Sequence, residues 1–313
     1  MSLDEGRRYS VAIRSAGNAE YLDRTLGSLA RQVPAPGEVV LVLPHGKDYA
    51  ETHGLPLKVV HAPASMIGQR DESVAACTHE AIVVMDDDIE FDVPDALANM
   101  IDLFHREKLD AVSPHTPGAY PSGLHRWVTA TFLISVPCFF RKRLRHICSG
   151  GYLYPMHLEP GETCPADGGI GQLFMVRRSF VQRHGITGDP DLKKVRYSFR
   201  DDGAYFQAMV MKGARIRMTG ACPFTHFGIG HRKTNEQRAV YAYTTVVCNH
   251  IFWKKYIYPR KPKVLSIPAY AWSCVGYGVI ALLKCVRRRT LKPLGGLLKG
   301  YAAMFSGSWR RAE

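Results

Sequence analysis

The sequence predicts an α/β protein built on a doubly wound, mostly parallel sheet, followed by a basic, amphipathic, helical appendage at the C-terminus. Two observations predict the sheet. Short apolar segments alternate with segments of helical periodicity over the first 90 residues, and the second apolar segment, 38–43, is apolar along nearly its whole length, as in a strand covered on both faces. A third observation predicts the appendage, because nearly all of the net charge of +13 lies in the last fifth of the 313 residues.

The first part of the chain contains the regular elements of the predicted sheet. Strands are expected at 9–13, 38–43, 56–62 and 81–85, with helices at 18–32 and 68–80 between them. Asn18 is placed to cap the first helix. With right-handed crossovers, ligands of such sheets bind at the carboxyl ends of the strands. Asp86, Asp87 and Asp88 directly follow the fourth strand, so they lie where ligands are expected.

The middle of the chain is less regular. Segment 110–123 is rich in turn residues. Residues 168–185 predict a loop, a strand and a helix, and residues 200–216 predict a helix that ends at Gly213 and a strand after it.

The C-terminal region, 236–313, carries the excess charge. Thirteen Lys and Arg residues and one Glu lie between residues 251 and 313, a local charge of +12. The run 264–283 is uncharged and has basic residues on both sides, and 291–307 is also amphipathic, basic and aromatic. Because the positive-inside rule favours one basic flank, we expect a helix that lies in the membrane interface or packs on the protein, with a single span at 264–283 as the alternative. The neutral body and basic tail favour an anionic membrane surface as partner and no nucleic acid.

The cysteines and the N-terminus indicate the compartment. The eight cysteines form no C-x-x-C pair, which argues against a zinc knuckle or a dithiol redox site and favours reduced thiols. The N-terminus MSLDEGRRYS has no apolar signal core, so we expect no cleaved signal peptide. The expected location is cytoplasmic, peripherally associated with the inner face of the cell membrane.

Three adjacent carboxylates repel one another at neutral pH, and two interpretations of Asp86 to Asp88 are open. One is a solvated turn after a strand. The other is a site for Mg²⁺ or Mn²⁺, which take oxygen ligands and neutralise a diphosphate. A site of this kind would need a cation, a base and a further ligand. Arg70, the acidic pair Asp201 and Asp202, and His226 are the candidates.

Four segments together resemble family 2 glycosyltransferases, which have the GT-A fold. Residues 10–32 match the family's opening strand, Ser/Thr–Asn loop and helix ending in Leu and Gln, and 68–88 reproduces its Arg–Asn pair sixteen residues before the aspartates, with Asp71 in the Asn place. Residues 201–213 match its acidic pair at a helix start, and His226 its loop histidine. The tail resembles members that build cell-surface polysaccharides at the membrane, including rhamnosyltransferase-like ones.

The resemblance implies an inverting transfer of a sugar from a nucleotide-sugar donor to a hydroxyl of a glycan or lipid-linked acceptor, with a divalent cation, Mg or Mn, as cofactor. The domain would cover 1–235, with a donor half at 1–114 and an acceptor half at 115–235. The residues carried over are, for the donor, Arg14, Ser15, Arg70, Asp86 and Asp87; for the metal, Asp88, Asp86 and His226; and for the general base, Asp202, with Asp201 beside it or in its place.

Two further expectations concern individual residues of this site. The flexible-looking loop 168–172 is expected to line the acceptor site with Gly169, Gly171 and Gln172. Among the three aspartates, Asp88 is the expected main ligand, Asp86 an assistant near the nucleotide, and Asp87 the most dispensable.

Three places depart from the family pattern. Arg14 stands where Pro is frequent, and Asp201 replaces Glu. Leu43, Pro44 and His45 stand where an Asp that reads uracil often ends the second strand, so a UDP donor is not assumed.

Three alternatives belong to other classes. A nucleotidyltransferase would favour a Gly-rich loop after the first strand, where RSAGNAE has one Gly. A nucleic-acid-binding protein would suit a charge of +13, but the body of this chain is neutral. The third is a membrane-anchored protein with inert carboxylates.

Overall fold

The computed structural model describes residues 8–115, 127–134, 147–151, 158–195, 197–228 and 234–311. The chain forms two compact units. The first consists of Met1–Pro117, His157–Gly188 and Tyr205–Gly230, and the second of Gly118–Met156, Asp189–Ala204 and His231–Glu313. This division differs from the expected boundary at 235, because two earlier segments are grouped with the C-terminal helices.

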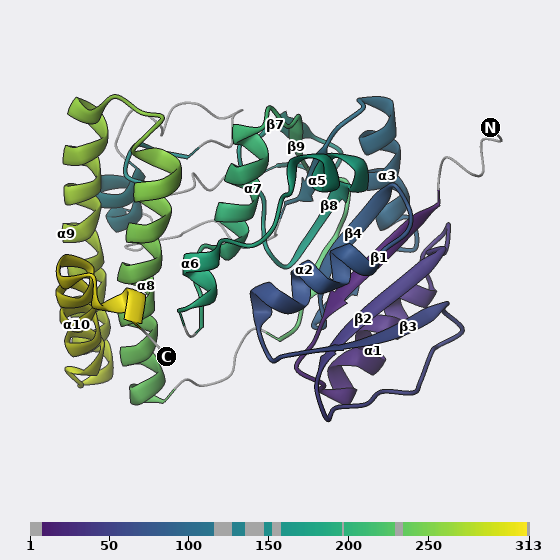
Figure 1. The fold of residues 1–313 in the computed structure, drawn as a ribbon, viewed down its shortest axis with the longest axis horizontal. Coiled ribbons are helices and arrows are strands. Elements are labelled where there is room, and N and C mark those ends of the chain that lie inside the picture. Colours follow the sequence, from purple (N-terminus) through teal and green to yellow (C-terminus); the bar gives the residue numbers. More distant parts are fainter. Residues whose placement is uncertain are drawn as a thin grey trace. The chain divides into compact units, whose positions relative to one another are not determined.

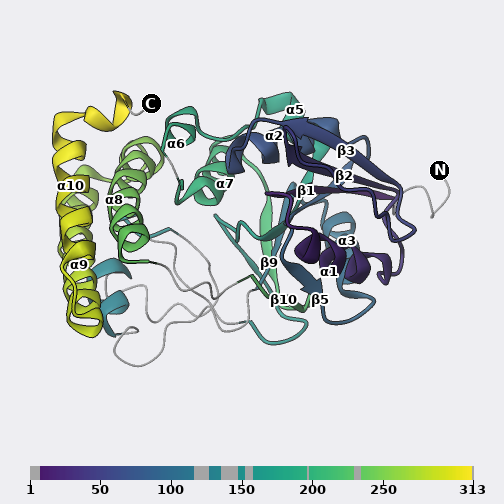
Figure 2. The ribbon, with the colours of Figure 1, turned by 90° about the horizontal axis from the view of Figure 1, so that it is seen from below.

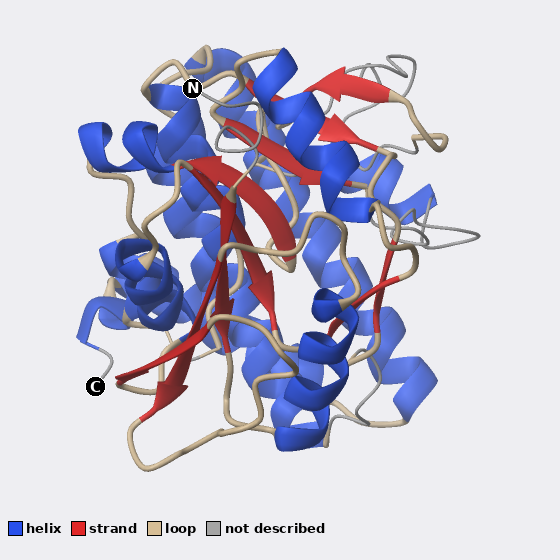
Figure 3. Ribbon diagram, turned by 90° about the vertical axis from the view of Figure 1, so that its right-hand side faces the viewer, coloured by secondary structure: helices blue, strands red, loops and turns tan. Residues whose placement is uncertain are grey.

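The first unit is built on an eight-stranded sheet of order β3-β2-β1-β4-β8-β6-β9-β7 (Figures 1 and 3). Its parallel half contains β1 (Tyr9–Arg14), β2 (Glu38–Pro44), β3 (Leu57–Ala62) and β4 (Ala81–Asp86), which confirms the four expected strands. The other half contains β6 (Ala111–Pro114), β7 (Thr163–Pro165), β8 (Leu173–Arg177) and β9 (Ile216–Thr219). β8 runs antiparallel to β4 and β6, and β7 antiparallel to β9, so the sheet is mixed at this end.

Helices cover both faces of this sheet, as Figure 2 shows for its parallel half. α1 (Ala19–Ala30) and α3 (Ala96–Arg106) pack on one face, and α2 (Met66–Ala76), α5 (Arg178–His184) and the body of α7 (Asp201–Met211) pack on the other. Successive side chains of β1 alternate between the two cores, Val11 and Ile13 in the first and Ala12 in the second. Burial on both faces explains why these strands are apolar along their length.

Local signals explain several element boundaries. The Asn18 side chain accepts a hydrogen bond from the Tyr21 amide, as predicted, and begins α1. Ser65 caps α2 in the same way, so that helix begins at Met66. It ends at Ala76, earlier than its expected end at 80. Gly213 has φ +82° just after α7, which confirms the predicted helix end.

The second unit is mainly helical. It contains α6 (Pro190–Lys193), the first turn of α7, α8 (Asn235–Phe252), a π-helical segment (Trp253–Ile257), α9 (Lys263–Arg288) and α10 (Lys292–Ser306). A further π-helical segment covers Thr129–Ile134, and a short 3₁₀ helix covers Ser308–Arg311. α8, α9 and α10 lie side by side in Figures 1 and 2. A Cβ at Gly296 of α10 would overlap the backbone of Ala239 in α8, so these two helices meet at glycine-sized contacts.

α9 has an unusual distribution of side chains. Its buried positions are small or polar, and they are Ser266, Ser273, Gly276, Ala281 and Cys285. Its large apolar side chains, such as Leu265 at 58% and Val286 at 78% exposure, face outward. In the part of the chain that the structure describes, α9 is the helix with the length and composition to cross a membrane.

Candidate active site

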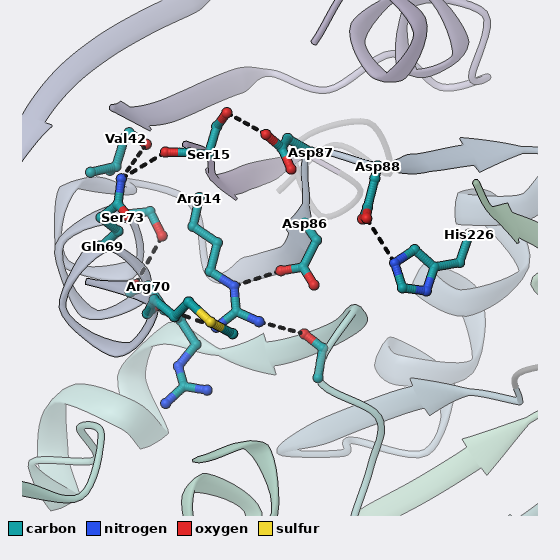
Figure 4. A network of polar contacts seen from close by, with 12 residues as sticks. Arg14, Ser15, Val42, Gln69, Arg70, Ser73, Asp86, Asp87, Asp88 and His226 are labelled. Carbon is teal, nitrogen blue, oxygen red and sulfur yellow. Dashed lines mark hydrogen bonds and ion pairs between the residues drawn. The ribbon is translucent and has the colours of Figure 1, made fainter. Parts of the chain in front are cut away.

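The three aspartates lie at the carboxyl end of β4, between β1 and a small second sheet. Asp86 is the last residue of β4 and pairs in register with Arg14 of β1. Asp87 and Asp88 lead into β5 (Ile89–Phe91), which pairs antiparallel with β10 (Phe224–His226). The three carboxylates therefore point to different partners, which Figure 4 shows.

Asp86 is paired with Arg14. Arg14 Nε donates to Asp86 Oδ1 at 2.5 Å, and the side chains are 9% and 21% exposed. The same guanidinium donates to the carbonyls of Met66 (3.2 Å) and Gly171 (3.5 Å). The expected donor residues Arg14 and Asp86 are thus brought together, and the residue that departs from the family pattern neutralises the first aspartate.

Asp87 is held by the loop after β1 and by α1. Ser15 Oγ donates a short hydrogen bond to Asp87 Oδ2, and Thr25 Oγ1 donates to the Asp87 carbonyl at 2.7 Å. Burial raises the pKa of Asp87 to about 6, against the effect of the Ser15 hydrogen bond, and the Asp88 and Asp86 charges add to the increase. Asp87 is therefore tied to the fold through both its side chain and its carbonyl, and the expectation that it is the most dispensable aspartate stays a prediction.

Sequence reasoning missed Gln69, which holds the same loop in place. Its side-chain amide nitrogen, Nε2, donates to the carbonyls of Ser15 (2.8 Å) and Val42 (3.2 Å) and so joins the ends of β1 and β2. The side chain is buried. The only signal in the sequence was its position next to Arg70, which marks the segment but does not indicate a role.

Asp88 lies against His226. His226 Nε2 is 2.9 Å from Asp88 Oδ2, and the pairing of β5 with β10 sets this approach because His226 is opposite Ile89 in register. Burial by itself would lower the pKa of His226, but the hydrogen bond to Asp88 and the charges of Asp88 and Asp86 outweigh it and raise that pKa. A Cβ at Gly228 would overlap the Asp88 carboxylate, so the glycine leaves the space that this carboxylate fills.

The expected acceptor loop lies beside these carboxylates. The Gln172 carbonyl accepts from the Asp86 amide at 2.9 Å, and the Gly171 carbonyl accepts from Arg14. Gln172 Oε1 is buried and has no hydrogen-bond partner among the described residues. A Cβ at Gly169 would overlap the Phe206 ring, so this glycine is required for packing. The contact of this loop with an acceptor stays a prediction.

Arg70 is enclosed within the first unit. Its side chain is 0% exposed, and its guanidinium carbon lies 4.7 Å from the centre of the Tyr205 ring. The neighbouring Asp71 carboxylate accepts from the Gly188 amide at 2.9 Å. The prediction that Arg70 contacts donor phosphates is not tested, and in this conformation the side chain is closed off from solvent.

Asp201 and Asp202 begin α7, as expected, and belong to the second unit, whereas the helix continues into the first. Asp201 is buried, and Asp202 Oδ1 accepts from the Gly203 amide at 2.7 Å. The preceding Arg200 donates from Nε to Asn249 of α8 at 2.8 Å, which fixes the start of α7 on that helix. The role of Asp202 as base stays a prediction.

The residues fit a cation only in part. Among the described residues, no group of three or more His, Cys, Asp or Glu side chains converges as a ready ligand set. Asp88 and His226 do lie together, and Asp88 Oδ1 and His226 Nδ1 are buried with no hydrogen-bond partner in the described part of the chain. Magnesium is commonly held by one or two carboxylates with substrate phosphates completing the shell, so Asp88 fits such a site, with His226 beside it, while Asp86 is engaged by Arg14.

Comparison with known proteins identifies the class. A sequence profile of the family described as "Glycosyl transferase family 2" matches residues 10–184, more than half of the chain. The sheet, its crossing helices and the aspartates at the end of β4 agree with that assignment. The chain belongs to glycosyltransferase family 2 and is a glycosyltransferase of the GT-A fold. A search among curated proteins gives no significant sequence match.

Solved structures of similar fold support the fold assignment. A mannosyltransferase from Pyrobaculum calidifontis, solved with GDP-Man and Mn²⁺, is 15% identical over 95% of this chain and 87% of that chain, with a TM-score of 0.53. GalNAc-T7, solved with UDP, GalNAc and Mn²⁺, is 12% identical over 91% of this chain and 58% of that chain, with a TM-score of 0.52.

Proposed function

We propose that this protein is an inverting glycosyltransferase that uses a divalent cation, Mg²⁺ or Mn²⁺, and transfers a sugar from a nucleotide diphosphate to a hydroxyl of a glycan or lipid-linked acceptor. The observation that carries the proposal is the Asp88–His226 pair at the carboxyl end of β4. Both structural neighbours above were solved with a nucleotide or nucleotide sugar and Mn²⁺, which supports such a donor.

The donor would bind at the ends of β1 and β4. Asp88 and His226 would hold the cation, which supplies positive charge to the leaving diphosphate. The hydrogen bond from Arg14 holds the Asp86 carboxylate at the end of β4, where it would lie near the nucleotide. Since Leu43 is buried and β2 ends in Pro44, no carboxylate stands at the end of that strand to read a base, so the donor base is left open.

The transfer itself needs a base and a positioned acceptor. The acceptor oxygen attacks the anomeric carbon, the bond from that carbon to the diphosphate breaks, and Asp202 takes the hydroxyl proton. Gln172 Oε1, buried without a partner among the described residues, is suited to accept a hydrogen bond from a substrate hydroxyl. No covalent intermediate is required, so no nucleophilic Ser or Cys is needed.

We also propose that the second unit holds the enzyme at the inner face of the cell membrane. The outward apolar side chains of α9 and the +12 charge of 251–313 support a helix in the interface of an anionic membrane. Cell-surface polysaccharide synthesis is the role that this combination favours.

A screen of nucleotide sugars by thermal shift, with and without Mn²⁺, tests the proposal. One donor should stabilise the protein only with the metal, and Asp88→Ala should lose that stabilisation. Asp202→Asn should keep donor binding but lose transfer by roughly 100-fold or more. Near-normal turnover in Asp202→Asn would show that another group is the base, and release of pyrophosphate instead of a nucleoside diphosphate would identify a nucleotidyltransferase.

A further inference from the structure

The helical unit contains a cavity that the proposed transfer reaction does not use. It has a volume of about 320 Å³ and lies among α8, α9 and α10. Its floor is apolar, because Ala281 and Leu297 belong to a buried cluster that joins α9 and α10 with α8. The cavity is therefore a feature of the second unit alone.

Four basic side chains line this cavity, and no acidic side chain does so among the described residues. Arg238 comes from α8, and Lys284, Arg287 and Arg288 come from the last turns of α9. Cations at the end of α9 are favoured by its helix dipole, so Arg287 and Arg288 alone would indicate nothing more. Arg238 lies near the positive end of α8, where a cation is disfavoured, and it donates to the neutral amide of Asn235. An anion in the cavity would relieve this concentration of like charge.

The apolar side chains beside the cavity indicate what kind of molecule carries the anionic group. Leu283 and Val286, at 42% and 78% exposure, lie on the same turns of α9 as the basic residues. A free phosphate would satisfy the charges but leave the apolar floor and these side chains uncovered. A phosphate attached to an acyl or isoprenoid chain would satisfy both.

We propose that this cavity binds the terminal phosphate or diphosphate headgroup of a membrane lipid, and so selects such lipids among anionic ones. The inference deepens the proposed membrane association and rests on it. It is independent of the transfer chemistry, because none of the cavity residues belongs to the candidate active site.

Vesicle flotation of the full chain tests the proposal. Vesicles of phosphatidylcholine with phosphatidic acid, which has a terminal phosphate, are compared with vesicles with phosphatidylglycerol, which has none, at matched surface charge. We expect tighter binding to the phosphatidic acid vesicles. Equal binding to both would overturn the headgroup site while leaving membrane association intact, and absence of binding to either would overturn membrane association itself.

A matched pair of variants locates the selectivity. Lys284→Gln with Arg288→Gln removes two charges from the cavity, and Lys261→Gln with Arg289→Gln removes the same two residue types from positions that do not line it. Both should weaken binding to all anionic vesicles, by about fivefold for each charge at low salt. Only the cavity variant should lose the preference for phosphatidic acid, and an equal preference in the two variants would overturn the proposal.

The source of the phosphate is tested by competition. Inorganic pyrophosphate at equal ionic strength should leave binding to phosphatidic acid vesicles largely unchanged, because it lacks the chain. Full displacement by pyrophosphate would assign the cavity to a soluble phosphate instead. Donor-dependent thermal stabilisation should be the same in both variants and the wild type, which separates failure of this site from failure of the proposed transferase.

Discussion

The guanidinium group of Arg14 connects the candidate site to α2 and to the loop before β8. It reaches the Asp86 carboxylate, the start of α2 at Met66 and the loop at Gly171. These partners lie 52 to 157 residues away in the sequence and meet only because β1 is central in the sheet. A proline at this position would provide none of these hydrogen bonds.

Arg14→Gln should destabilise the first unit, because Asp86 would keep its charge without the pairing cation. The expected loss in the free energy of unfolding is about 1.5–3 kcal/mol at pH 7, the range for hydrogen bonds to charged groups. Urea unfolding measures it. Asp86→Asn in the Arg14→Gln background should recover part of the loss, and additive single effects would contradict the pairing. Arg24→Gln, at a 49% exposed side chain, is the control and should change little.

Prediction from sequence succeeded and failed at this scale for different reasons. Asp88 and His226 were predicted as neighbours, and they are, because a motif at the end of a strand reports its position in the sheet. The dispensability of Asp87 stays a prediction, and its contacts with Ser15 and Thr25 were not predicted, because no periodicity reveals such tertiary contacts. The same holds for the enclosure of Arg70 by Tyr205.

Individual elements were predictable where they are repetitive and apolar. The four parallel strands and α1 follow from local signals that a single sequence contains. β6 was not expected, because 110–123 is rich in turn residues and only pairing with β8 and β9 makes Ala111–Pro114 a strand. The remainder of that segment, beyond 115, lies outside the described residues.

The packing of α10 on α8 makes a prediction at the level of elements. Gly296→Ala should destabilise the second unit by about 1–3 kcal/mol, because the added methyl meets the backbone of Ala239. Gly295→Ala is the matched control, since nothing lies within 4 Å of its Cβ position, and it should stabilise α10 by up to about 1 kcal/mol. Thermal unfolding compares the two, and similar melting temperatures would contradict the close helix contact.

The attachment of α6 to the segment after α8 should depend on pH. Lys255 Nζ lies 2.6 Å from Asp191 and 3.0 Å from the buried Asp189, and the hydrogen bond from Lys255 holds the pKa of Asp191 below its usual 3.8. The contribution of the Lys255–Asp191 pair to stability is therefore present above pH 3.8. It is lost as the pH falls through the lower pKa that Asp191 has in the folded state.

Asp191→Asn should accordingly flatten the loss of stability below the usual pKa of 3.8 and lower the free energy of unfolding at pH 7 by about 1 kcal/mol or less. Urea unfolding from pH 7 to 3 measures both effects. Glu236→Gln changes an exposed ion pair with Lys292 and is the control. It should leave the loss of stability at low pH as in the wild type. If Asp191→Asn loses stability at low pH as the wild type does, the Lys255–Asp191 pair contributes nothing to stability.

Charge and apolar surface are divided unevenly over the whole molecule. The first unit contains the sheet and the aspartates Asp86 to Asp88, and the last 63 residues hold +12 of the +13 net charge. The sequence predicted this asymmetry directly, since charge can be counted. It did not predict which side of 264–283 faces outward, because that depends on small residues packing in the helical unit.

Substitution of Leu265, Leu282 and Val286 by Ser should weaken binding to anionic vesicles roughly tenfold or more. The fold should be retained, because all three side chains are at least 50% exposed. The control substitutes Ser for Val33, Val93 and Met211, which are exposed elsewhere. Flotation at low and high salt separates the contributions, since salt weakens the electrostatic one and leaves the apolar one. Retention of the triple variant at high salt would contradict an apolar contact through α9.

The arrangement of α9 also determines how the protein must be handled. A helix with its small residues inward and its leucines and valines outward has the reverse of the pattern that keeps a protein monodisperse in buffer. Without lipid, we expect copies of the chain to cover these faces with one another. A mild detergent above its critical micelle concentration will therefore act as a structural reagent during purification, and the elution volume will report whether α9 is covered.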